Sequence, residues 1–277
     1  MMSAMSRFEH QIAADAVARE TCAAELAKVL DGFEALRFGD GGIAYGGLLD
    51  GRADGGELRL LAEPHAAAGG RYRYTDPGTP GTPGTPGEPV DSAAPAARTA
   101  AFAADFTLDS WDRAGTTSVR FAASETAAPA DGAEGSGSVV LRRGAGRCTV
   151  EVSGEYRGGG PRSALLAASV SATADACRWW SRAEGAAGAQ GGDAPVVVRL
   201  RHRYAVAVVR VSPAPDPAPG PAGPRWLLTV RTDVRGRSWA RPVLAVVLLL
   251  GRSRLRRLYA RALDEMATAG AQQPAAE

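Results

Sequence analysis

The stretch that decides the fold begins with residues 196–211, VVVRLRHRYAVAVVRV, and continues after a proline-rich link with residues 225–236, RWLLTVRTDVRG. Between residues 196 and 208, the even positions are apolar or aromatic apart from His202, and arginines fill the middle odd positions. Side chains on a strand point alternately to opposite faces. The stretch therefore predicts one strand with an apolar face and an arginine-rich face, and its β-branched residues favour the same assignment.

The second stretch repeats this alternation. Trp226, Leu228 and Val230 share one face, and Thr229 and Arg231 share the other. The link at residues 212–224, SPAPDPAPGPAGP, has too many prolines for a helix or an inner strand. The two stretches therefore predict an antiparallel hairpin with a long, stiff loop.

A helix is predicted after the hairpin. Pro242 suits a first helical turn, and apolar residues recur from there to Met266 at the spacing of a helix. Residues 243–250 are apolar nearly all round, which favours burial inside a protein. This run is much shorter than the roughly 20 residues needed to cross a bilayer.

The rest of the chain predicts two more helices, at residues 15–30 and 163–182, with short alternating strands between them. No strand is evident before the first of these helices. Segments 76–98 and 212–224 are rich in Pro and Gly, so we expect flexible insertions in a single domain of residues 1–277. Residues 149–166 and 229–246 share a strand, Arg-Gly, Pro, helix order. Either the chain has diverged halves, 1–186 and 194–277, or such transitions look alike in Ala/Arg-rich chains.

Composition indicates a globular protein, since 45% of the 277 residues are hydrophobic and 22% are charged. A net charge of +2 gives no general reason to expect nucleic-acid binding. Cys22, Cys148 and Cys177 are too few and too far apart for a disulfide framework or a zinc site. The sequence therefore predicts reduced cysteines, a cytoplasmic location, and no metal or other cofactor. The N-terminus lacks the apolar core of a signal peptide.

His202 is the candidate acid or base, because it lies beside Tyr204 on the predicted apolar face and its imidazole titrates near neutral pH. The alternative is a histidine that packs against a neighbouring polar group. The sequence contains no HExxH, CxxC, P-loop or GxSxG motif. It therefore favours a binding protein over an enzyme; an enzyme of cyclase or dehydratase type would use His202 and Tyr204.

The arginines of the first strand are candidates for anion binding. Arg199, Arg201 and Arg203 would project in one row that could bind phosphate or acidic lipid headgroups. The alternative is an outer sheet face neutralised by nearby carboxylates. Residues 243–257 could also form a peripheral membrane helix, since four arginines follow their apolar half.

Two segments resemble the START-like, polyketide-cyclase-like superfamily. Residues 226–266 are similar to its last strand, turn and terminal amphipathic helix. Residues 137–158, GSVVLRRGAGRCTVEVSGEYRG, resemble its paired late strands around a Gly turn. The resemblance implies a helix-grip fold of the α+β class, in which an antiparallel sheet wraps around a long C-terminal helix and encloses an apolar cavity.

The predicted function is binding of an apolar or amphipathic small molecule, lipid-like or polyketide-like, in a cavity between the sheet and the C-terminal helix. The lining residues would be Leu200, His202, Tyr204, Trp226, Leu228 and Val230. The alternative is a non-enzymatic interaction protein that docks an acidic partner or a membrane surface through its arginine-rich face.

Overall fold

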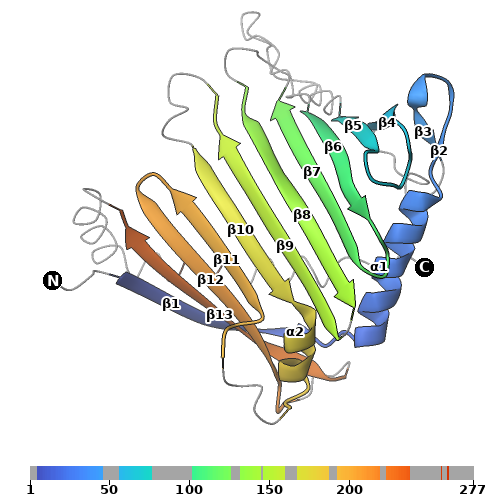
Figure 1. The fold of residues 1–277 in the computed structure, drawn as a ribbon. Coiled ribbons are helices and arrows are strands. Elements are labelled where there is room, and N and C mark those ends of the chain that lie inside the picture. Colours follow the sequence, from blue (N-terminus) through green and yellow to red (C-terminus); the bar gives the residue numbers. More distant parts are fainter. Residues whose placement is uncertain are drawn as a thin grey trace, which may run out of the picture.

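A single large antiparallel sheet dominates the structure, which is a computed structural model (Figure 1). It describes residues 5–45, 56–76, 102–125, 132–144, 146–159, 167–186, 192–218, 223–237, 257 and 261. Eleven strands lie in the order β1-β13-β12-β11-β10-β9-β8-β7-β6-β5-β4. Each strand from β4 onward pairs with the next in sequence, and the first strand of the chain joins the last.

The elements follow one another along the chain as β1 (Met5–Asp15), α1 (Arg19–Glu34), β2 (Arg37–Phe38), a 3₁₀ turn (Asp40–Gly42), β3 (Ala44–Tyr45), β4 (Glu57–Ala62), β5 (Arg71–Asp76), β6 (Phe102–Trp111), β7 (Thr116–Glu125), β8 (Glu134–Gly144), β9 (Arg147–Arg157), β10 (Ala168–Asp175), α2 (Ala176–Ala183), β11 (Val196–His202), β12 (Ala205–Pro215) and β13 (Arg225–Gly236). The short strands β2 and β3 form a separate two-stranded sheet.

The predicted fold class is wrong. The described residues are mostly one sheet, with two α-helices of 16 and 8 residues, and they include no long C-terminal helix for a sheet to wrap around. Residues 242–266, for which that helix was predicted, lie outside the described residues apart from Arg257 and Arg261. The predicted insertion at 76–98 also lies outside them, except for Asp76 at the end of β5.

The helix predicted at residues 163–182 is replaced by a strand and a short helix. The segment ASVSATAD alternates small apolar and polar residues, and it pairs with β9 on one side and β11 on the other. The Asp175 carboxylate then accepts a hydrogen bond from the Arg178 backbone N–H, at 2.9 Å, and caps α2. Alanine fits both periodicities, so its abundance concealed the two-residue repeat.

The strand predicted at residues 196–208 is a hairpin. It reverses at Arg203 and Tyr204, and β11 pairs with β12 from Val196↔Val211 to Arg201↔Val206. The predicted antiparallel pairing with β13 holds only for the second half of this stretch, which is in β12, whereas β11 pairs with β10 and β12. However, Pro213 and Pro215 belong to β12 and not to a loop. They are tolerated because the β11 pairing stops at Val211, so no ladder partner on that side needs their missing N–H groups.

The opening strand β1, absent from the prediction, pairs with β13 over its whole length. Asp233 of β13 links three strands on one side of the sheet. Its Oδ1 accepts a hydrogen bond from Arg7 Nε of β1 at 3.0 Å, and its Oδ2 accepts one from Arg210 Nη1 of β12 at 2.6 Å. Burial alone would raise the pKa of Asp233, but these two guanidinium groups outweigh it and lower the pKa.

We expect Asp233→Asn to lower the free energy of unfolding by about 2 kcal/mol at pH 7, because it removes the charge from two charge-assisted hydrogen bonds. The folded-state pKa lies below the unfolded value of about 3.9. The carboxylate therefore stabilises the fold above that unfolded value, and the contribution is lost as the pH falls through the folded pKa. Urea titrations at pH 7 and at successively lower pH values should show a difference from wild type that shrinks as the pH falls. An equal difference at all of these pH values would contradict this assignment.

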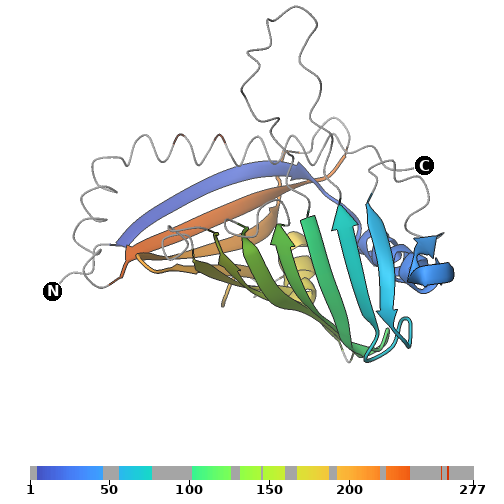
Figure 2. The same ribbon diagram turned by 90° about the horizontal axis from the view of Figure 1, so that it is seen from above.

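Strand register divides the sheet residues between two faces. The apolar face comprises the even-numbered residues of β1, β5, β9, β10, β11 and β13 and the odd-numbered residues of β7, β8 and β12. It also includes Leu58 and Leu60 of β4 and, in β6, the even-numbered residues up to Leu108 followed by Trp111. The opposite side is the polar face. The buried strand residues Phe8, Tyr72, Ala104, Leu108 and Val230 all lie on the apolar face. Seen from above, the sheet twists and curves between β1 and β4 (Figure 2).

Candidate functional site

The apolar face is continuous across the sheet. One row of paired residues runs from β13 to β6 and contains a single polar member, Thr117. The row is Val230, Val211, Val196, Ala174, Val150, Leu141, Thr117 and Trp111. Three large side chains of this face are well exposed: Phe102 (40%), Leu200 (44%) and Tyr156 (48%). The face therefore offers partly uncovered apolar surface over several strands.

Two paired glycines shape the middle of this face. Gly137 of β8 lies opposite Gly154 of β9 and, on its other side, opposite Phe121 of β7. A Cβ atom on Gly137 would lie 2.7 Å from the Phe121 ring and 2.9 Å from Gly154 Cα, and it would also meet the Ser153 carbonyl oxygen. The Phe121 ring therefore occupies space that any side chain at residue 137 would need.

The predicted lining residues share the apolar face but do not gather at one point. Leu200 and Trp226 lie near opposite ends of their strands, because Leu200 pairs through Ala207 with Val234, eight residues beyond Trp226. At about 3.4 Å per residue, these ends are about 27 Å apart. Leu228 and Val230 follow Trp226 along β13, and Val230 is buried. The six residues thus mark an extended surface and not the wall of one compact cavity.

His202 and Tyr204 lie at the β11–β12 turn. The Tyr204 backbone N–H donates to His202 Nδ1 at 3.4 Å, and the two rings lie 5.3 Å apart. The Arg203 guanidinium stacks over the Tyr204 ring at 5.5 Å from its centroid. These contacts hold a turn that contains no glycine or asparagine. An acid or base role for His202 and Tyr204 stays a prediction.

Trp226 serves as a docking point for α2. Its ring makes edge contacts with Trp179 at 5.7 Å and Trp180 at 5.4 Å between centroids. The Cys177 thiol, in the first turn of α2, donates to the Gly146 carbonyl at 2.9 Å. These contacts fix α2 at the end of the strands opposite the β11–β12 turn (Figure 1).

A partly buried polar pair, which no sequence pattern predicted, joins α1 to the sheet. His65 Nε2 lies 3.1 Å from the Phe33 carbonyl oxygen of α1, which can only accept, so Nε2 carries the proton. His65 Nδ1 therefore accepts from the Tyr72 hydroxyl at 2.9 Å, and that hydroxyl accepts from the Ala66 N–H at 2.9 Å. Burial raises the pKa of Tyr72. The rings of Phe33 and Phe38 contact both members of this pair, and Trp111 packs against Phe33.

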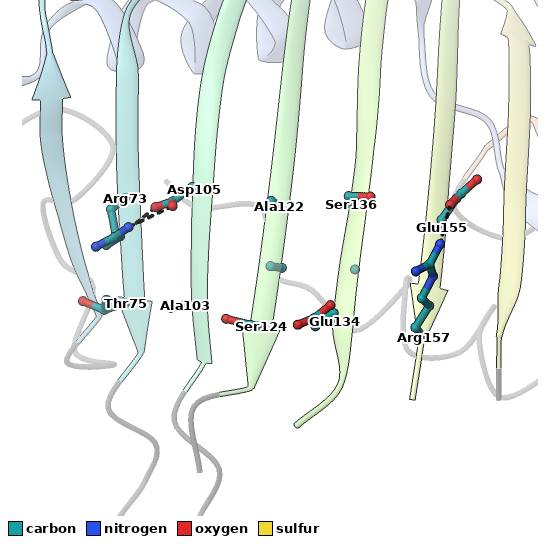
Figure 3. Close-up of a pocket in the computed structure, with 12 residues that line it drawn as sticks. Arg73, Thr75, Ala103, Asp105, Ala122, Ser124, Glu134, Ser136, Glu155 and Arg157 are labelled. Atoms are coloured by element: carbon teal, nitrogen blue, oxygen red, sulfur yellow. Dashed lines mark hydrogen bonds and ion pairs between the residues drawn. The ribbon is translucent and has the colours of Figure 1, made fainter. Parts of the chain in front are cut away.

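A groove of about 720 Å³ lies on the polar face (Figure 3). Figure 3 shows Arg73 turned toward Asp105, and the two form a bidentate pair at 2.7 and 2.9 Å. This hydrogen bonding lowers the pKa of Asp105. The groove is lined mainly by small and hydroxyl side chains from β5 to β9, together with Arg157, Glu155 and Glu134. Because its cations are paired with carboxylates, it has the character of a solvated outer face.

The three predicted anion-binding arginines do not form one row. Arg199 and Arg201 are exposed on the polar face of β11, whereas Arg203 lies in the turn. The residues that pair with Arg199 and Arg201 on the flanking strands are Ser171, Ser169, Val208 and Val206. No carboxylate therefore pairs across the strands with either arginine, and anion binding by Arg199 and Arg201 stays a prediction.

Three further observations concern the described part of the chain. It contains no helix that is both long and apolar enough to cross a membrane. Within it, no three His, Cys, Asp or Glu side chains are placed to hold a metal ion together. Its three cysteines are free.

Comparisons of the chain with protein-family models, curated proteins and solved structures found no match. The START-like resemblance therefore stays a prediction.

Proposed function

We propose that the protein binds an apolar or amphipathic small molecule, lipid-like or polyketide-like, against the apolar face of its sheet. The observation that carries this proposal is the exposure of Phe102, Tyr156 and Leu200 on the apolar face. Exposed apolar patches on folded proteins often mark interaction or ligand-binding sites. We place the protein in the cytoplasm, which its free cysteines favour.

Binding would come mainly from removing apolar surface from water. Each methylene of the ligand that becomes buried contributes about 0.8 kcal/mol, which corresponds to about four-fold in affinity. An extended sheet face should therefore favour a long flexible chain over a compact ring system, because a chain can extend along the exposed apolar side chains of neighbouring strands.

The test is native mass spectrometry of protein purified without detergent, followed by titration with saturated fatty acids of increasing length. We expect a co-purifying hydrophobic ligand and an affinity that rises with chain length. The double variant Tyr156→Ser, Leu200→Ser should bind about ten-fold more weakly, because two apolar contacts are lost.

The matched control is Arg157→Ser, Arg201→Ser, which changes the next residue of each strand on the polar face. It should bind as wild type does. The proposal fails if the wild-type protein carries no ligand and shows no saturable binding to any chain length.

A further inference from the structure

Arg143 is a cation on the apolar face. It lies near the end of β8, pairs in register with Cys148 of β9, and follows Leu141 on the same face. Its backbone N–H donates to the Gly115 carbonyl at 2.7 Å. Its neighbour Arg142 is on the polar face and forms an ion pair with Glu151 at 2.6 Å. These adjacent arginines therefore lie on opposite faces of the sheet, and Arg142 has a carboxylate partner there.

The Arg143 guanidinium has donors that the protein does not satisfy. Its Nε and Nη2 atoms are buried, and no described residue accepts a hydrogen bond from either. A buried donor without a partner destabilises a fold, and a charged one more so. Unsatisfied buried polar groups in folded proteins concentrate at functional sites. The Nε–Nη2 edge is also one of the two-donor edges by which arginine binds a carboxylate with two parallel hydrogen bonds.

The charges around Arg143 restrict which ligand could accept hydrogen bonds from its guanidinium group. Among the described strand residues, register places the carboxylate of Asp76 on the apolar face, at the opposite strand end from Arg143. Arg113, in the β6–β7 turn, is already ion-paired with Asp31 and Glu34 of α1, whereas Nε and Nη2 of Arg143 have no acceptor among the described residues. A phosphate monoester carries close to two negative charges at neutral pH, whereas a carboxylate carries one and matches a single guanidinium.

We propose that Arg143 binds the carboxylate of an amphipathic monocarboxylic acid whose apolar chain lies on the apolar face, beginning over Leu141 and Val150. This inference rests on the proposed function and names the chemical class of its ligand. Arg143 orients the chain by fixing its head at the strand end near α1 and the β8–β9 turn. The valines of the face supply affinity for the chain and do not distinguish one head group from another.

The experiment compares a saturated fatty acid with the alcohol of the same chain length, by calorimetry below the micelle concentration of each, at pH 8. Wild type should prefer the acid by about ten-fold or more, the range expected for a hydrogen-bonded charge in a desolvated site. Arg143→Leu should lose this preference and still bind the alcohol. The matched control Arg142→Leu should keep it, since that side chain faces the other way.

Thermal unfolding of the variants shows whether a loss of preference reflects misfolding. Arg143→Leu should unfold at the wild-type temperature or above it, because it replaces unsatisfied donors with an apolar group. Equal binding of acid and alcohol by wild type, or loss of the preference in Arg142→Leu as well, would overturn the assignment to Arg143 and leave the proposed function standing. Failure to bind either compound would overturn the proposed function itself.

Discussion

Tyr72→Ala is expected to lower the free energy of unfolding by about 4 kcal/mol, the range for removing a large aromatic side chain from a core. Tyr72 is 2% exposed and is among the most buried large side chains described. Its ring lies against Phe33 of α1, with centroids 5.4 Å apart. Its hydroxyl joins His65 and the Ala66 backbone. Losing it would therefore loosen α1 from the sheet as well as leave a cavity.

Tyr72→Phe separates the hydroxyl from the ring. It keeps the packing but leaves His65 Nδ1 and the Ala66 N–H without their partner, so we expect a loss of about 1–3 kcal/mol. Tyr45→Ala is the control, because that tyrosine is 58% exposed; its effect should stay within about 0.5 kcal/mol. Urea unfolding measures all three. A Tyr72→Ala protein as stable as the control would show that this cluster does not hold α1.

Gly137→Ala should destabilise the fold by about 2–3 kcal/mol, the upper part of the range for overpacking. The added Cβ would meet the Ser153 carbonyl oxygen and Gly154 Cα of the neighbouring strand, and these backbone atoms cannot turn aside as a flexible side chain can. It would also displace the Phe121 ring from the middle of the apolar face.

Gly135→Ala is the matched control, two residues away on the same strand and the same face. There the nearest atom to an added Cβ is the Glu155 carbonyl oxygen at 3.7 Å, an ordinary contact. We expect stability within about 0.5 kcal/mol of wild type. If urea unfolding gives both variants the same stability, the close approach at Gly137 is refuted.

Alternation of side chains was the most informative signal in the sequence. It placed Leu228 and Val230 together on the apolar side of β13 and predicted the pairing of β12 with β13. It failed at Arg203 and Tyr204, where the chain reverses without the Gly or Asn that marks most tight turns. It also failed in β10, where small residues fit a helix and a strand equally well. These two failures, together with the unrecognised β1, hid the extent of the sheet, and the wrong fold class itself came from the long C-terminal helix that the START-like resemblance implied.

The candidate site was predictable only in part. Leu200 was assigned correctly to the apolar side of its strand. Its distance from Trp226, however, depends on how three strands pair, and no local sequence pattern specifies that pairing. The His65–Tyr72 pair depends on a contact with Phe33, more than thirty residues earlier. Arg143 could have been found, because continuing the alternation from Val139 and Leu141 places it on the apolar face.

Cross-linking with a fatty acid that carries a photoreactive group in its chain tests the central claim most directly. After irradiation and peptide mapping, the labelled residues should lie on the apolar face, near Val139, Val150 and Val152, and an excess of unlabelled fatty acid should suppress the labelling. Labelling confined to the polar groove, at Thr75, Ser124 or Ser136, would contradict the claim that the apolar face is the ligand-binding surface.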